Sequence, residues 1–147
     1  MKPVFADTLF WIAIFLPGDP WAKAAKAVDL SEVSLVTTEE VLGEFLTAVS
    51  GYGDRTRHLA YKLIREILKD PDVEVVVQSH ESFLGGLALY GKRPDKQCSL
   101  ADCISMNVMR RKRIQEILTH DHHSLRRALF GSYREGSEGR ASPFQPA

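Results

Sequence analysis

The sequence predicts an α/β fold in which helices cover both faces of a mainly parallel sheet. Four short β-like segments alternate with longer stretches of helical periodicity, the pattern typical of such folds. The chain has 147 residues, about the length of one domain, and is 44% hydrophobic and 26% charged, as expected of a globular protein. Nineteen Lys and Arg residues balance nineteen Asp and Glu residues, which excludes a strongly basic, histone-like nucleic-acid binder.

The predicted strands are short runs that are mostly apolar and rich in β-branched residues. They are Pro3–Ala6, Val33–Val36, Val73–Val77 and Glu116–Thr119. Helical periodicity fills the segments between them. The predicted helices are Thr8–Leu16, Trp21–Val28, Thr38–Ser50, Thr56–Lys69, a helix within Glu81–Tyr90, and Leu100–Arg111.

Helix-breaking residues set the ends of several of these helices. Pro17 ends the first helix, Gly51 follows the third, and Pro71 follows the fourth. From Gly131 onward Gly, Ser, Pro and charged residues dominate. We therefore expect one domain over residues 1–130 and a flexible C-terminal tail over residues 131–147.

No segment of the sequence is predicted to cross a membrane. The longest apolar run, Leu9–Leu16, is far shorter than the ~20 residues needed to span a bilayer, and it lacks a signal-peptide cleavage site. The spacing of Cys98 and Cys103 suits no common zinc motif. These features predict a soluble, cytoplasmic protein.

Four acidic residues fall at strand ends or near the starts of the helices that follow. They are Asp7, Glu44, Asp102 and Asp121. In open parallel sheets, functional sites form beyond the carboxyl ends of the strands. Four acids that converge there would repel one another unless a cation lay among them. Oxygen ligands suit Mg²⁺ or Mn²⁺, which activate water and stabilise phosphate oxygens, so the pattern predicts phosphodiester hydrolysis.

Each acid also has a purely structural explanation. Asp7 and Asp121 could be N-caps of the helices that follow them, and Ser99 with Asp102 has the spacing of a capping box. Glu40 falls opposite the apolar stripe of its helix and pairs with Thr37 at capping-box spacing. Glu44, at the flank of that stripe, is the better functional candidate.

The three histidines around Asp121 suggest zinc as an alternative. They are His120, His122 and His123. Adjacent histidines cannot all face one ion, so solvated or substrate-facing imidazoles are favoured.

These motifs resemble those of the PIN-domain nucleases, and within them the VapC-like toxins. The matching segments run from Phe5-Ala6-Asp7-Thr8 to Leu118-Thr119-His120-Asp121 and cover about residues 3–125. Between them, Val36–Leu46 carries Glu44, and Ser99–Met106 carries Asp102. The resemblance implies a three-layer α/β/α PIN-like fold and a Mg²⁺- or Mn²⁺-dependent endoribonuclease. It also implies a toxin, commonly a homodimer, that a cognate antitoxin holds inactive.

By position in these motifs, the four acids are the metal-site residues. The resemblance makes Ser99 a residue that orients Asp102, and Thr8 a further supporting residue. Arg126 and Arg127 lie just beyond Asp121 and are predicted to contact RNA phosphates. The basic run Arg110–Arg113 has two interpretations, which are contact with RNA phosphates or a solvated helix end.

Two other functions compete with the ribonuclease. The family often has an aromatic residue where this chain has Ser124, so a catalytically weak or inactive PIN-like RNA- or protein-binding module is the main alternative. Phosphotransfer on an Asp7 nucleophile is disfavoured because Leu9 stands where a second acid is expected. The aromatic residues Trp11, Phe15 and Trp21 are predicted to lie in the core or in a partner groove.

Overall fold

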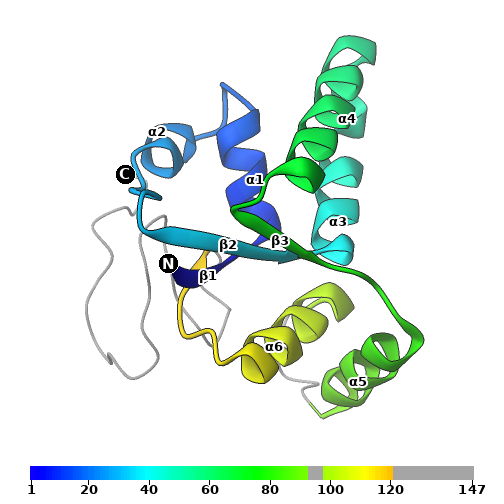
Figure 1. Ribbon diagram of the computed structural model, residues 1–147. Coiled ribbons are helices and arrows are strands. Elements are labelled where there is room, and N and C mark those ends of the chain that lie inside the picture. The colour runs from blue at the N-terminus through cyan, green and yellow to red at the C-terminus, as the bar shows by residue number, and fades with distance from the viewer. Residues whose placement is uncertain (93–97, 121–147) are drawn as a thin grey trace.

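The computed structural model describes residues 1–92 and 98–120, in which four parallel strands form one sheet between two layers of helices (Figure 1). The strands are β1 (Lys2–Ala6), β2 (Val33–Thr38), β3 (Val73–Val76) and β4 (Ile117–Leu118). Their order across the sheet is β3-β2-β1-β4. The predicted α/β fold with a mainly parallel sheet is therefore confirmed.

The strand register brings three chain segments together at one edge of the sheet. β1 pairs with β2 up to Phe5↔Val36 and with β4 at Phe5↔Ile117 and Ala6↔Leu118. Because all of these strands run in the same direction, their carboxyl ends meet at one edge. Asp7, the start of α3 and Thr119 are neighbours there for this reason.

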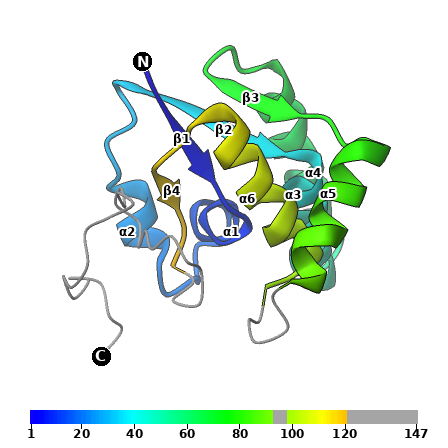
Figure 2. The same cartoon turned by 90° about the horizontal axis from the view of Figure 1, so that it is seen from below.

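The helices are divided between the two faces of the sheet. One face carries α1 (Thr8–Phe15), α2 (Ala22–Lys26), α3 (Glu39–Val49) and α4 (Asp54–Lys69), and the other carries α5 (His80–Gly91) and α6 (Leu100–Lys112). The view from below shows α6 in front of the sheet with α5 beside it (Figure 2). A short 3-10 turn, Ser50–Tyr52, links α3 to α4.

Apolar residues of β1 and α1 are buried in the core of the protein. Val4, Phe5 and Ala6 are all buried, as expected of a central parallel strand covered on both faces. Phe15 of α1 packs edge-on against Phe45 of α3, with 5.3 Å between the ring centroids. Trp11 is also buried, which confirms the core interpretation for this side chain.

Several element boundaries differ from the prediction. Helix α2 is shorter at both ends, and α4 begins two residues earlier, at Asp54. Gly53 has φ of 97°, a conformation that glycine adopts readily, and this turn leads the chain directly into α4. Among the described residues, no helix combines the length and apolar character that a membrane span requires. Asp121 and the predicted tail, residues 131–147, lie outside the described residues.

Candidate functional site

Asp7 follows β1 directly, and its carboxylate lies almost entirely inside the protein. It stands at the N-cap position of α1, yet its side chain makes no capping hydrogen bond, contrary to the simplest structural interpretation. Instead, the Thr119 hydroxyl at the end of β4 donates a hydrogen bond of 2.9 Å to Asp7 Oδ2. Only 8% of Asp7 and none of Thr119 is exposed. A neighbouring strand therefore holds the first acid, together with the backbone N–H of Thr8 at the start of α1.

Glu44 lies one turn inside α3 and accepts a hydroxyl hydrogen bond at each carboxylate oxygen. Thr8 Oγ1, in the first turn of α1, donates to Oε2 at 2.8 Å, and Ser99 Oγ donates to Oε1 at 3.1 Å. The Glu44 carboxylate thus connects the N-terminal ends of α1 and α6. Thr8 and Ser99, both singled out in the sequence, are brought to Glu44 by the fold.

Asp102 and Ser99 form the capping box that their spacing predicts. The Ser99 hydroxyl accepts from the Asp102 backbone N–H at 3.1 Å, and the Ser99 backbone N–H donates to Asp102 Oδ2 at 2.9 Å. Because the same Ser99 hydroxyl donates to Glu44, this residue connects two of the acids. The structural and functional interpretations of Asp102 are therefore compatible.

The electrostatics show that the three acids interact. The pKa of Asp7 is raised to about 7, first by burial of the carboxyl and then by the negative charge of Asp102, with a smaller contribution from Glu44. Hydrogen bonds from the Thr8 backbone and the Thr119 hydroxyl act in the opposite direction, because they favour the charged form. A cation among these carboxylates would relieve their mutual repulsion.

The donor set at this edge consists of carboxylate and hydroxyl oxygens, which suits a hard divalent cation. Within residues 1–92 and 98–120, no group of three or more His, Cys, Asp or Glu side chains is placed so that it could hold a metal ion. Of the described acids, Glu44 and Asp102 are linked through Ser99, and Asp7 is bound by Thr119. Asp121, the fourth predicted acid, lies outside the described residues, as do Arg126 and Arg127.

Two buried threonines near the site were not predicted to take part in it. The sequence predicts Thr119 only as the last residue of a strand. Its polar side chain at the end of an apolar strand is the signal that could have indicated a role in the site. Thr37 was assigned to a capping box with Glu40, and this assignment is wrong because Thr38 caps α3 by accepting from the Val41 N–H. The Thr37 hydroxyl instead donates to the Ala6 carbonyl at 2.9 Å and accepts from Trp11 Nε1 at 3.3 Å.

Other predicted features lie at the margins of the site or far from it. The basic run Arg110–Arg113 lies at the opposite end of α6 from Asp102, and Lys112 there forms an ion pair with Glu74. The ring of His120 stacks on Trp21, with 4.8 Å between centroids and 12° between ring planes. The stack connects the end of β4 to the segment before α2.

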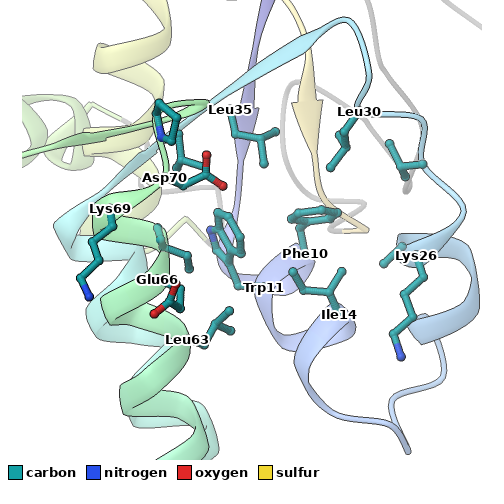
Figure 3. A pocket seen from close by; sticks show the side chains of 15 residues that line it. Phe10, Trp11, Ile14, Lys26, Leu30, Leu35, Leu63, Glu66, Lys69 and Asp70 are labelled. Atoms are coloured by element: carbon teal, nitrogen blue, oxygen red, sulfur yellow. The ribbon is translucent and has the colours of Figure 1, made fainter.

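An apolar cavity of about 580 Å³ opens on the α1 side of the sheet (Figure 3). Phe10, Trp11 and Ile14 of α1 line it, facing Leu63 of α4. Charged side chains from α2 and α4, among them Lys26, surround this apolar surface.

Comparison with known proteins agrees with this architecture. The chain superimposes on the crystal structure of VapC20 from Mycobacterium tuberculosis, described as a sarcin-ricin loop cleaving toxin, with a TM-score of 0.71 and 27% sequence identity. The match covers 81% of this chain and 90% of VapC20. A search of curated proteins gave no match. The sequence model of the PIN domain matches residues 4–129, most of the chain, and the protein therefore belongs to the PIN domain family.

Proposed function

We propose that this protein is a metal-dependent endoribonuclease that hydrolyses RNA phosphodiester bonds and acts as the toxin of a type II toxin–antitoxin pair. Membership of the PIN domain family and the likeness to the VapC20 toxin support a toxin ribonuclease. The observation that carries the proposal is the meeting of Asp7, Glu44 and Asp102 at one sheet edge, where two of these acids raise the pKa of the third.

In this proposal the four acids hold Mg²⁺ or Mn²⁺. Asp7, Glu44 and Asp102 supply oxygen ligands, and Asp121 completes the set. When bound, the ion activates a water molecule and offsets the charge on the phosphate oxygens. Thr8 and Ser99 hold the Glu44 carboxylate in place through the hydrogen bonds that their hydroxyls donate.

The substrate proposed here is a loop in a structured RNA, by analogy with the RNA loop that VapC20 cleaves. Arg126 and Arg127 are proposed to contact its phosphates, since they closely follow Asp121 in the sequence. A cytoplasmic location follows from such a substrate.

The cognate antitoxin is proposed to dock in the apolar cavity between α1, α2 and α4. Its walls are Phe10, Ile14 and Leu63, and the charged groups around them would set the orientation of a peptide segment (Figure 3).

A homodimer is proposed as well, and exposed apolar side chains such as Leu68 of α4 provide surface for it. Light scattering after size-exclusion chromatography measures the molar mass in solution and so tests the proposed homodimer.

Calorimetric titration with Mn²⁺ tests the proposed metal site. The wild type should bind the ion, and Asp7→Asn and Asp102→Asn should each lose most of the binding while remaining folded. Asp72→Asn is the matched control, because Asp72 is exposed and lies outside the site. The two site variants should also lose at least about 100-fold in RNA cleavage.

One observation favours the competing function. Among the described residues, the acids do not form a group of three that could hold a metal ion by themselves. If the folded wild type fails to bind Mn²⁺, the better interpretation is a catalytically weak or inactive PIN-like module that binds RNA or protein. RNA binding that is independent of metal and unaffected by the acid substitutions would support that module.

A further inference from the structure

A second cavity, of about 520 Å³, opens beside the proposed catalytic acids on the α5–α6 side of the sheet. Its lining includes Glu40, Gln78, Ser79, His80, Phe83 and Ala101. Ala101 is the residue immediately before Asp102, and Glu40 lies one turn before Glu44 on α3. The cavity is therefore adjacent to the acids along two different helices.

Local hydrogen bonds hold the walls of this cavity. The Gln78 backbone N–H donates to Glu39 Oε1 at 2.7 Å, which ties the segment after β3 to the start of α3. Ser79 and Ser82 form a capping box at the start of α5. A Cβ at Gly86 would clash with the Ile104 side chain, so the absence of a side chain there lets α5 approach α6 closely. Hydrogen bonds and close helix packing therefore fix the backbone around the cavity.

The chemistry of the lining indicates a planar, uncharged ligand. Phe83 is 43% exposed, and the ring of His80 lies nearly parallel to it, 6.5 Å away between centroids. Glu40, Gln78 and Ser79 add hydrogen-bonding groups. No Lys or Arg is among the described residues that line the cavity, so a phosphate would find no cation there. An exposed aromatic ring with polar groups around it is how proteins bind unpaired nucleobases.

We propose that this cavity binds one unpaired base of the RNA, next to the phosphodiester bond that is hydrolysed at the acids. The base stacks on Phe83, and its Watson–Crick edge meets Glu40 and Gln78. This inference rests on the proposed ribonuclease function and adds base preference to it.

The carboxylate of Glu40 sets which base fits best. An ionised carboxylate accepts hydrogen bonds and donates none. Guanine presents two adjacent donors, its N1–H and its exocyclic amino group, to such an acceptor. Uracil places carbonyl oxygens on both sides of its single N–H, and these would face the carboxylate unfavourably. The cavity therefore favours guanine and disfavours uracil.

Fluorescence anisotropy with four labelled RNA pentamers tests this preference. Each pentamer is uridine except at its central position, which carries G, A, C or U, and EDTA prevents cleavage. The full-length wild type should bind the G pentamer about 10-fold more tightly than the U pentamer. Phe83→Leu should weaken binding of the G pentamer by about 5- to 10-fold, and Glu40→Gln should reduce the G-to-U ratio toward one.

Leu84→Ala is the matched control, because Leu84 is exposed on the same helix and does not line the cavity. Circular dichroism melts of every variant exclude unfolding as the cause of a change. Equal affinity for all four pentamers, or a G preference that survives both cavity substitutions, would overturn the inference. A change of oligomeric state in Phe83→Leu with unchanged RNA binding would also overturn it, since the cavity would then belong to a protein interface.

The test separates this inference from the proposed function. Binding of the pentamers in EDTA needs no metal, whereas the Mn²⁺ titration depends on the acids. If Mn²⁺ binds and the pentamers are not distinguished, the metal site stands and the base cavity fails. If the pentamers are distinguished and Mn²⁺ does not bind, the cavity stands and the protein is an RNA-binding module.

Discussion

Thr119 and Asp7, which are 112 residues apart in the sequence, are joined by a buried hydrogen bond of 2.9 Å. The pairing of β4 with β1 brings them together, since Ala6 is in register with Leu118. The hydroxyl donates to the carboxylate and so favours its charged form, against the effect of burial. This one hydrogen bond affects both the orientation of the first acid and its readiness to bind a cation.

Replacing Thr119 with Val should raise the pKa of Asp7 above its present value of about 7, because the variant has no hydroxyl to donate the hydrogen bond that lowers it. At neutral pH a larger fraction of Asp7 would then be protonated and unable to bind an ion. We expect the Mn²⁺ affinity at pH 7 to fall by roughly 10-fold, as for other groups that support a metal ligand. Calorimetry at several pH values should show that the pH at which Mn²⁺ affinity reaches half its maximum is higher in the variant.

Thr119→Ser provides the control for this prediction, because serine retains the hydroxyl. It should restore the wild-type pH profile even if loss of the methyl group lowers stability. A Val variant with an unchanged profile would show that the hydrogen bond only supports packing.

The raised pKa of Asp7 also predicts a dependence of stability on pH. A folded-state pKa of about 7, above the ordinary value of 3.8, means that the folded protein holds a proton that the unfolded chain releases. The contribution of Asp7 to the free energy of unfolding of the metal-free protein should therefore decrease as pH rises from about 4 to about 7, and level off above that.

Asp7→Asn removes this dependence, because the amide does not titrate. The melting temperature of this variant minus that of the metal-free wild type should rise with pH across that window, and exceed about 3 °C at pH 8. Thermal melts in EDTA at several pH values measure the difference, with exposed Asp72→Asn as the control. A constant difference across pH would contradict the assignment of a raised pKa to Asp7.

Most of the fold follows from local patterns in the sequence. All four strands were predicted from short runs rich in apolar and β-branched residues. The central strand β1 is the clearest case, because Val4, Phe5 and Ala6 are consecutive and buried. The capping box of Ser99 and Asp102 was also predicted, because it depends on a spacing of three residues.

What the sequence could not predict depends on the packing of distant segments. Thr119 reaches Asp7 only through the strand register, and Thr37 was misassigned because Thr38, its neighbour, is an equally good helix cap. The cavity beside Glu40 could not be predicted either. It requires α3, α5 and α6 to be packed around it.

The proposed binding of RNA phosphates by Arg126 and Arg127 predicts a change in salt dependence. Replacing both with Gln removes two positive charges that closely follow Asp121 in the sequence. The slope of log affinity against log salt should become less steep by roughly one for each phosphate that the variant no longer binds. Filter binding with a fixed RNA between low and moderate salt measures the slope, and Arg55 with Arg57, exposed on α4, gives the control pair. An unchanged slope would exclude the two arginines from the RNA path.

Thr8 and Ser99 should act together on metal binding, because both donate to the same carboxylate. Thr8→Val and Ser99→Ala should each weaken Mn²⁺ binding by about 10-fold. In the double variant, the fold-loss of Mn²⁺ affinity should be clearly smaller than the product of the two single fold-losses. Once one substitution has released the Glu44 side chain, removal of the second hydrogen bond changes its position less.

The loss of a helix cap must be separated from the loss of metal binding in this cycle. Ser99→Ala also removes the helix cap of α6, which costs about 1 kcal/mol of stability, so melting temperatures are measured alongside calorimetry. Thr47→Val on α3, which loses only an exposed hydrogen bond to the Gly43 carbonyl, should leave Mn²⁺ affinity unchanged. If the effects of Thr8→Val and Ser99→Ala on affinity are fully additive, the two hydroxyls do not act through Glu44, and Ser99 supports the site through Asp102 alone.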